Sequence, residues 1–275
     1  MISNKEVIKN IINFIFNHNY LKSKFKHHKQ KYSINELLEP LFYILLNGVY
    51  YREVGKLFDI NWTTIYKFHQ KIIKLNIFLL YYNFLLDAYL KKNSNNLNYL
   101  IVDSTFIVNK KGSELITYNP QIKKHKTCKI SLIVDEFNIP INFKLDNSLK
   151  HDSKLFQEQL NDIIEKNMNL KNKIFLGDAA YDSNKTREFL KNNNLGMLYC
   201  SKNKRNCQKN FIKNNNLHER LLLEKRIKIE HFFNRLKQFK RLNIRYDSKT
   251  IYFKNFIYLA LIVIFLQKIK INEIF

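Results

Sequence analysis

The chain is poor in residues that cross-link or punctuate a fold, with 3 Cys, 3 Pro and 5 Gly among 275 residues. Cys128, Cys200 and Cys207 are too few and too scattered for a disulfide framework, and none forms the CxxC or Cys/His spacing of a zinc site. A reduced, intracellular compartment is therefore expected. No glycine-rich phosphate loop is present either, so we expect no nucleotide cofactor.

Long apolar runs are also missing. Lys5, Glu6 and Lys9 interrupt the apolar residues at the start of the sequence, which excludes a signal peptide. The run Phe256–Leu266 is too short to span a bilayer, so we expect no membrane partner. A hydrophobic fraction of 45% with 25% charged residues excludes a disordered tail or a coiled coil as the main structure.

Negative charge is scarce. Asp and Glu number 23 against 47 Lys and Arg, which gives a net charge of +24 and points to a polyanion such as nucleic acid. A genome drifting toward adenine- and thymine-rich codons would also enrich Lys and Asn, and this explanation stays open. Arginine is more informative because such drift works against it. Most arginines lie between Arg205 and Arg245, where the basic segment 201–250 could follow DNA phosphates.

The apolar pattern changes character near residue 95. Residues 1–95 have helical spacing throughout, whereas residues 96–275 alternate between strand and helix patterns. We expect a hairpin from Lys129–Asp135 and Pro140–Leu145, and one long helix from about Leu217 to Phe239. The sequence therefore predicts a helical region followed by an α/β domain with a mixed sheet.

Residues 51–73 read as two helices joined by a short turn at Asp59–Asn61. This spacing is typical of a helix-turn-helix, whose second helix enters the major groove through its N-terminal residues. The candidate DNA contacts are Thr63, Thr64, Tyr66 and Lys67. An ordinary helical hairpin that packs on the rest of the protein is the alternative.

Three acids stand out by their positions. Asp103 ends the predicted strand LIVD, Asp178 follows the strand IFLG, and Glu230 lies inside the long predicted helix. Such hard oxygen donors suit Mg²⁺, and a pair of such ions can promote displacement at phosphorus. We expect the three carboxyl groups to meet. Each acid taken alone could instead be structural, because an Asp after a strand often caps a turn.

The third acid belongs to a patterned helix. Arg226, Glu230 and Lys237 are spaced i, i+4 and i+11, which places one acid between two cations on one helical face. A solvated face with ion pairing is the alternative. His151 and Asp152 could form a further acid–base or metal group, but we expect Asp152 to cap the helix that follows it.

Together, LIVDST, GDAAYDS and Arg-x3-Glu-x6-Lys resemble the three acidic motifs of DDE transposases. The segments KKHKTCKISLIVDEFNIPI, LKHDSKLF and RLKQFKRLNIRYD resemble the insertion sequence five branch of these enzymes, and the resemblance runs over about 97–266. It implies an RNase H-like (retroviral-integrase-like) fold: a mixed sheet flanked by helices, after an all-helical N-terminal region. Leu223 departs from the related signature, which has Tyr there.

The resemblance also implies roles. Asp103, Asp178 and Glu230 would be the catalytic metal ligands, with Mg²⁺ or Mn²⁺ as the ion, and Arg226 and Lys237 would contact DNA phosphates. Residues 1–95 would be the DNA-binding region and 96–275 the catalytic domain.

The expected function is that of a DNA transposase, which cleaves and joins strands at the ends of a mobile element. Its expected partners are double-stranded DNA, both element ends and target, and a second copy of the chain. It would act inside the cell, wherever that DNA is. Two alternatives stay open: an RNase H-like metal-dependent nuclease without strand transfer, and a catalytically inert DNA-binding protein derived from a transposase.

Overall fold

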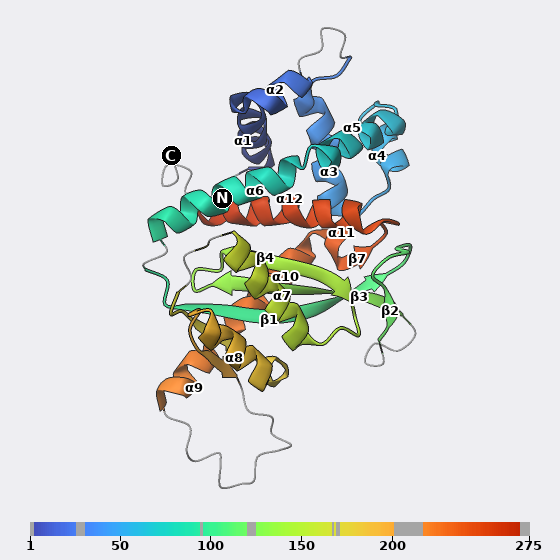
Figure 1. Ribbon diagram of the computed structural model, residues 1–275. Coiled ribbons are helices and arrows are strands. Elements are labelled where there is room, and N and C mark those ends of the chain that lie inside the picture. Colours follow the sequence, from blue (N-terminus) through green and yellow to red (C-terminus); the bar gives the residue numbers. More distant parts are fainter. Residues whose placement is uncertain are drawn as a thin grey trace. The chain divides into compact units, whose positions relative to one another are not determined.

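A computed structural model describes residues 3–25, 31–93, 96–119, 125–166, 168, 171–200 and 217–269 (Figure 1). The basic loop 201–216 lies outside the described residues. The helices are α1 (Asn4–Asn17), α2 (Asn19–Phe25), α3 (Ile34–Asn47), α4 (Tyr51–Leu57), α5 (Trp62–Lys74), α6 (Ile77–Asn93), α7 (Asp152–Glu165), the 3₁₀ helix η2 (Ala179–Tyr181), α8 (Asn184–Asn192), α9 (Leu217–Glu224), α10 (Ile227–Gln238), α11 (Lys240–Asn243) and α12 (Thr250–Lys268). The strands are β1 (Tyr99–Asn109), β2 (Thr117–Tyr118), β3 (Lys126–Asp135), β4 (Pro140–Asn147), β5 (Ile174–Gly177), β6 (Leu198–Cys200) and β7 (Ile244–Arg245).

The chain forms two compact units that do not follow the order of the sequence. One combines Met1–Ala88 with Asn109–Glu114 and Leu236–Phe275, and the other combines Tyr89–Val108 with Leu115–Arg235. The C-terminal helix α12 therefore belongs with the N-terminal helices. The functional division into 1–95 and 96–275 stays a prediction.

The first unit is built from amphipathic helices, as the apolar spacing predicts. Helix α1 buries Val7, Ile8, Ile11 and Ile15 along one face and contacts α3 and α12. Helix α3 begins at a capping box formed by Ser33 and Glu36. It ends at Gly48, whose φ of 71° is a conformation that glycine adopts without strain.

Helix α12 is the central apolar element of this unit. It has 19 residues and is longer than the apolar run Phe256–Leu266 in the sequence. Its length and composition alone would allow it to cross a membrane. However, 67% of its apolar window is buried inside the protein, and it packs on α1, α5 and α11. The helices α5 and α6 are long and apolar enough to cross a membrane only when taken together, and they are bent by 48° relative to each other. Burial of this extent is typical of a core helix.

The segment 51–73 forms two helices, α4 and α5, joined by a short turn at Asp59–Asn61. Its identity as a DNA-reading helix-turn-helix stays a prediction. Asp59 adopts a positive φ of 51° in that turn, and the Asn61 side chain caps α5 by accepting the Thr63 amide hydrogen. A Cβ on Gly55 would lie 2.8 Å from the Ile60 carbonyl oxygen. Only glycine therefore allows this close approach between α4 and the turn.

The second unit contains the mixed sheet that the sequence predicts. Its strands follow the order β2-β3-β1-β5-β6, and β4 pairs with β3. The pairs β1–β3 and β3–β4 are antiparallel, whereas β1–β5 and β5–β6 are parallel. Helix α7 packs on β3 and β4 (Figure 1). The hairpin is thus confirmed, with longer strands than expected.

Strand β1 does not end at Asp103, as the sequence suggested. It continues to Asn109 because β3 pairs with it from Leu100–Asp135 to Val108–Thr127. Asp103 therefore stands in the middle of β1, opposite Leu132 of β3. The apolar run stops at this acid, but the strand pairing does not.

The long helix expected between Leu217 and Phe239 is broken. Helix α9 ends at Glu224 and α10 begins at Ile227. The Lys225 and Arg226 amide hydrogens bond to the carbonyl oxygens of Leu222 and Leu223, three residues back. This tighter turn interrupts the α-helical repeat. Arg226 therefore precedes the helix that carries Glu230 and Lys237, and the three do not share one continuous helical face.

Candidate active site

Asp103 and Asp178 lie at the same level of neighbouring parallel strands. In the register between β1 and β5, Ile101 faces Leu176, so two residues further on Asp103 comes level with Asp178. Asp178 follows the last residue of β5 and caps η2, accepting the Ala180 amide hydrogen at 2.8 Å. Asp103 thus lies on β1, and Asp178 directly follows the neighbouring strand β5. Their catalytic role stays a prediction.

The electrostatics of Asp103 indicate a crowded acidic site. The pKa of Asp103 is raised to about 6, chiefly by burial and also by the negative charges of Asp178 and Asp152. The Ser104 amide hydrogen, 2.8 Å from Asp103 Oδ1, and the Arg226 guanidinium act in the opposite direction on this pKa. Carboxylates whose charges act on one another are stabilised in their ionised form by a positive charge beside them.

Asp152 is the site residue that sequence reasoning misplaced. Helix α7 is capped by His151, whose ring nitrogen accepts the Ser153 amide hydrogen, and not by Asp152. Instead, Asp152 Oδ1 accepts a hydrogen bond from the Ser104 hydroxyl at 2.7 Å and one from the Lys129 ammonium at 3.1 Å. The signal in the sequence is a lysine at the start of the mainly apolar strand KISLIVD.

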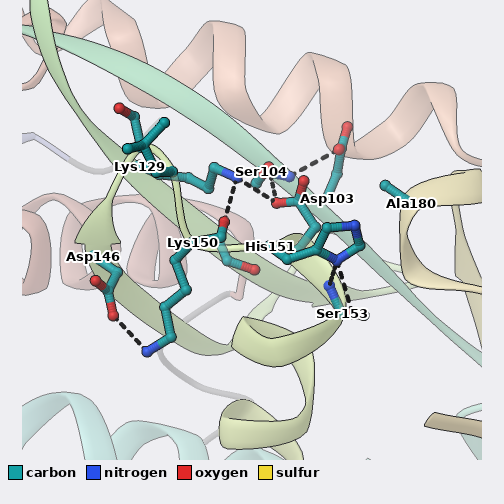
Figure 2. A network of polar contacts seen from close by, with 12 residues as sticks. Asp103, Ser104, Lys129, Asp146, Lys150, His151, Ser153 and Ala180 are labelled. Carbon is teal, nitrogen blue, oxygen red and sulfur yellow. Dashed lines mark hydrogen bonds and ion pairs between the residues drawn. The ribbon is translucent and has the colours of Figure 1, made fainter. Parts of the chain in front are cut away.

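Lys129 is a buried cation with several partners. Only 4% of its surface is exposed. Besides Asp152, its ammonium donates to the Lys150 carbonyl oxygen at 2.8 Å and lies 5.2 Å from the centre of the Phe106 ring. Figure 2 shows this ammonium reaching toward Ser104, while the Lys150 ammonium binds Asp146. Lys129 thereby ties β3 to the first turn of α7.

Tyr181 places a buried hydroxyl among these acids. Its ring packs edge-on against Phe156, and its buried hydroxyl has the Ser104 side chain as the hydrogen-bonding group that acts on it. Burial, followed by the charges of Asp152 and Asp103, holds the pKa of Tyr181 well above its ordinary value. A water molecule, free or bound to an ion, would complete the hydrogen bonding of this hydroxyl.

Glu230 is exposed in the first turn of α10. Within the described part of the chain, no three His, Cys, Asp or Glu side chains gather closely enough to hold a metal ion. The expected meeting of all three acids is therefore not seen, and the structure brings together two of them. The aspartate pair and the Tyr181 hydroxyl fit a hydrated divalent cation, which prefers carboxylate oxygens and water.

The two candidate phosphate-binding cations differ in their surroundings. Arg226 is half-buried, and its charge lowers the pKa of Asp103, which places it at the acidic site. Lys237 is also half-buried, and burial lowers its pKa. It lies in the part of α10 that belongs to the first unit. Contacts of either residue with DNA stay predictions.

The candidate DNA contacts of α5 also differ in accessibility. Lys67 is exposed, whereas Thr63 and Thr64 are partly exposed. The Tyr66 hydroxyl donates to the Tyr252 hydroxyl at 2.8 Å, and the two rings stack with their centres 5.5 Å apart. Tyr66 therefore fastens α5 to α12. Lys67, whose side chain is exposed, is better placed than Tyr66 to contact DNA.

Comparison with known proteins separates a strong family match from weak structural likenesses. The model of the transposase DDE domain family matches residues 96–266. A search of curated proteins found no match. Among solved structures, the Mos1 transposase paired-end complex with left transposon end has a TM-score of 0.29 and 10% identity, covering 88% of this chain and 100% of that one.

Two further structures are similarly distant. The Mos1 strand transfer complex has a TM-score of 0.30 and 11% identity, covering 98% of this chain and 97% of that one. The piggyBac transposase synaptic complex with hairpin DNA has a TM-score of 0.39 and 12% identity, covering 77% and 52% respectively. These likenesses are too weak to add to the family match, and the insertion sequence five branch stays a prediction. Because the family match spans well over half of the chain and includes the RNase H-like mixed sheet, the protein belongs to the transposase DDE domain family.

Proposed function

We propose that the protein is a DNA transposase that cleaves phosphodiester bonds and transfers strands at the ends of a mobile element. The observation that carries this proposal is the placement of Asp103 on β1 and of Asp178 directly after the neighbouring parallel strand β5, inside the segment that matches the family. Burial and neighbouring carboxylates raise the pKa of Asp103, which is typical of an acid group organised for function.

The proposed cofactor is Mg²⁺ or Mn²⁺, since DDE transposases use divalent metals. Asp103 and Asp178 would hold the ion, and Glu230 would join them from the exposed first turn of α10. When bound, such ions activate the attacking oxygen and stabilise the leaving one. Arg226, whose charge already acts on Asp103, is suited to neutralise the phosphate being cleaved.

The proposed reaction has two displacements at phosphorus. In the first, the oxygen of a water molecule bonds to phosphorus at the element end, and the 3′ oxygen leaves and takes up a proton. In the second, the 3′-hydroxyl loses its proton, its oxygen bonds to a phosphorus atom of target DNA, and the 3′ oxygen of the target leaves and is protonated. The same acids would serve both steps.

The proposed partners are double-stranded DNA and a second copy of the chain. The net charge of +24 supports association with DNA, and Thr63, Thr64 and Lys67 at the start of α5 would read the sequence of the element end. A dimer follows from the reaction, because two element ends must be brought together. Inside the cell, the protein would act where that DNA lies.

The test uses the full chain, Mg²⁺ and duplexes taken from the DNA that flanks the gene. A transposase should nick at an inverted repeat and join the new 3′ end to a second duplex. Cleavage without joining would identify a metal-dependent nuclease, and specific binding without cleavage would identify an inert DNA-binding protein. Either result would overturn the proposed transposase activity.

A further inference from the structure

Ser104 links the proposed metal ligand Asp103 to a residue on a different element. Its amide hydrogen bonds to Asp103 Oδ1 at 2.8 Å, and its hydroxyl bonds to Asp152 Oδ1 at 2.7 Å. Asp103 and Ser104 belong to β1, whereas Asp152 is the first residue of α7. The orientation of the residue that donates to Asp103 is therefore set in part by α7.

Asp152 is itself held firmly. The ammonium of Lys129, which is 4% exposed, donates to the same Oδ1 atom at 3.1 Å and is fixed from the other side by the Lys150 carbonyl oxygen. Because the buried ammonium has its hydrogen-bond partners in place, Asp152 cannot swing away without leaving a buried charge poorly paired. Figure 2 shows Ser104 beside Asp103, and the Lys129 ammonium bonded to the Lys150 carbonyl oxygen and to Asp152.

A comparable ion pair joins the same helix to another strand of the sheet. Asp162, also on α7, accepts a hydrogen bond from Lys144 of β4 at 2.9 Å. This pair likewise joins α7 to the sheet, but both of its side chains are 30% exposed. Asp162 is not among the charges that act most strongly on Asp103, whereas Asp152 is. Both ion pairs dock α7 on the sheet, but only the pair that contains Asp152 also acts on the acidic site. Comparing variants of the two pairs therefore distinguishes these two roles.

We propose that Asp152 is a positioning residue that acts through Ser104 to hold the Asp103 carboxylate in the orientation that binds a divalent cation. This inference rests on the proposed function, because it assumes that Asp103 is a metal ligand. Groups that orient a ligand in this way commonly change metal affinity by about 10–100-fold. Asp152 itself need not touch the ion or the DNA.

The experiment measures Mn²⁺ binding to the full chain without DNA, by following the electron paramagnetic resonance signal of free Mn²⁺. Ser104→Ala removes the hydroxyl that links the two acids, and Asp152→Ala removes its acceptor. We expect each to weaken Mn²⁺ binding by about 10-fold. Ser104→Thr keeps the hydroxyl and should restore most of the affinity, and the matched control Asp162→Ala should bind Mn²⁺ like the wild type.

The outcomes separate this inference from the function on which it rests. If Ser104→Ala and Asp152→Ala both bind Mn²⁺ with the affinity of the wild type, the positioning role is overturned and the proposed metal site stays intact. An equal loss in Asp162→Ala would overturn it too, since docking of α7 would then explain the effect. Absence of Mn²⁺ binding by the wild type would overturn both. Asp152→Ala leaves the buried Lys129 ammonium with only a carbonyl partner and can therefore prevent folding. If it does, the Mn²⁺ affinity of Ser104→Ala decides whether the positioning role holds.

Discussion

Asp103 stands level with Asp178 across two parallel strands, two residues beyond the pair formed by Ile101 and Leu176. Neither acid is conspicuous alone, since Asp178 also caps a turn and Asp103 lies in the middle of a strand. Their placement matters because like charges close together destabilise the metal-free protein and favour a cation between them. The catalytic proposal follows from this relationship.

Replacing Asp103 with Asn should leave the metal-free protein as stable as the wild type or more stable. The folded pKa of about 6 lies above the ordinary value of 3.8, so at neutral pH the ionised carboxylate opposes folding, and the amide removes this effect. The measurement is thermal unfolding in the presence of a chelator. A loss of about 1–3 kcal/mol would instead mark Asp103 as a structural acid whose hydrogen-bond donors lose their partner.

Asp135 should give the folding stability a distinct pH dependence. It is buried, it accepts hydrogen bonds from Phe137 and Ile139, and burial raises its pKa to about 6 from 3.8. The folded protein therefore holds this proton more tightly than the unfolded chain, and the contribution of this group falls as the pH rises from about 4 to 6.

Urea unfolding across this pH window tests the prediction. The wild type should lose about 2 kcal/mol more than Asp135→Asn between the two ends of the window, since one pKa unit corresponds to about 1.4 kcal/mol. Parallel stability curves for the two proteins would show that Asp135 does not titrate in this way.

The buried ion pair of the first unit should be sensitive to the loss of one partner. Arg241 binds both carboxylate oxygens of Asp247, at 3.0 and 2.7 Å, and both side chains are 3% exposed. Asp247→Ala leaves the guanidinium buried without its counter-ion, which should cost about 3–5 kcal/mol. The control is Asp182→Ala, which breaks the exposed pair with Arg187 and should cost at most about 1 kcal/mol. Similar losses in chemical denaturation would contradict this account.

The residues of α5 should separate DNA reading from scaffolding. Lys67→Ala and Thr63→Ala should reduce discrimination between an element end and random duplex, because these side chains lie at the accessible start of the helix. Tyr66→Phe removes the hydrogen bond to Tyr252 and should lower stability by about 1 kcal/mol without changing discrimination. Competition binding assays with the three variants measure this. If Tyr66→Phe alone alters discrimination, the helix presents a different face to DNA.

Arg226→Ala and Lys237→Ala should weaken binding to element ends and flatten its salt dependence. A variant that has lost a phosphate contact releases fewer counterions when it binds DNA. The slope of log affinity against log salt should therefore become shallower by about 1 for each lost contact. Lys154, which lies on α7, offers a control in Lys154→Ala. An unchanged slope in the first two variants would remove these cations from the DNA interface.

Local pattern was enough to predict much of the fold. Alternating and helical apolar spacing gave the β3–β4 hairpin, the turn between α4 and α5 and the mixed sheet. The sequence did not show that β1 continues past Asp103, because that extension is stabilised by pairing with β3 and not by its own apolar residues. It also missed the break before Ile227, where three-residue hydrogen bonds replace the α-helical ones.

The candidate site was predictable where its residues follow apolar runs in the sequence, and not where distant side chains meet. Asp103 and Asp178 each follow an apolar run, which is a local signal. The bond between Ser104 and Asp152 joins positions 48 residues apart, and only the packing of α7 on the sheet creates it. The same holds for Lys129, whose burial depends on Asp152 as its partner.

The most direct test is Mg²⁺-dependent cleavage and strand transfer on the flanking repeats by the wild type, Asp103→Asn, Asp178→Asn and Glu230→Gln. Asp162→Asn serves as the control, because Asp162 pairs with Lys144 on the sheet. The account predicts that all three active-site variants fold but neither cleave nor transfer strands, since each loses a carboxylate proposed to hold the ion, while the control retains both activities. Retained cleavage in a folded Asp103→Asn or Asp178→Asn variant would contradict it.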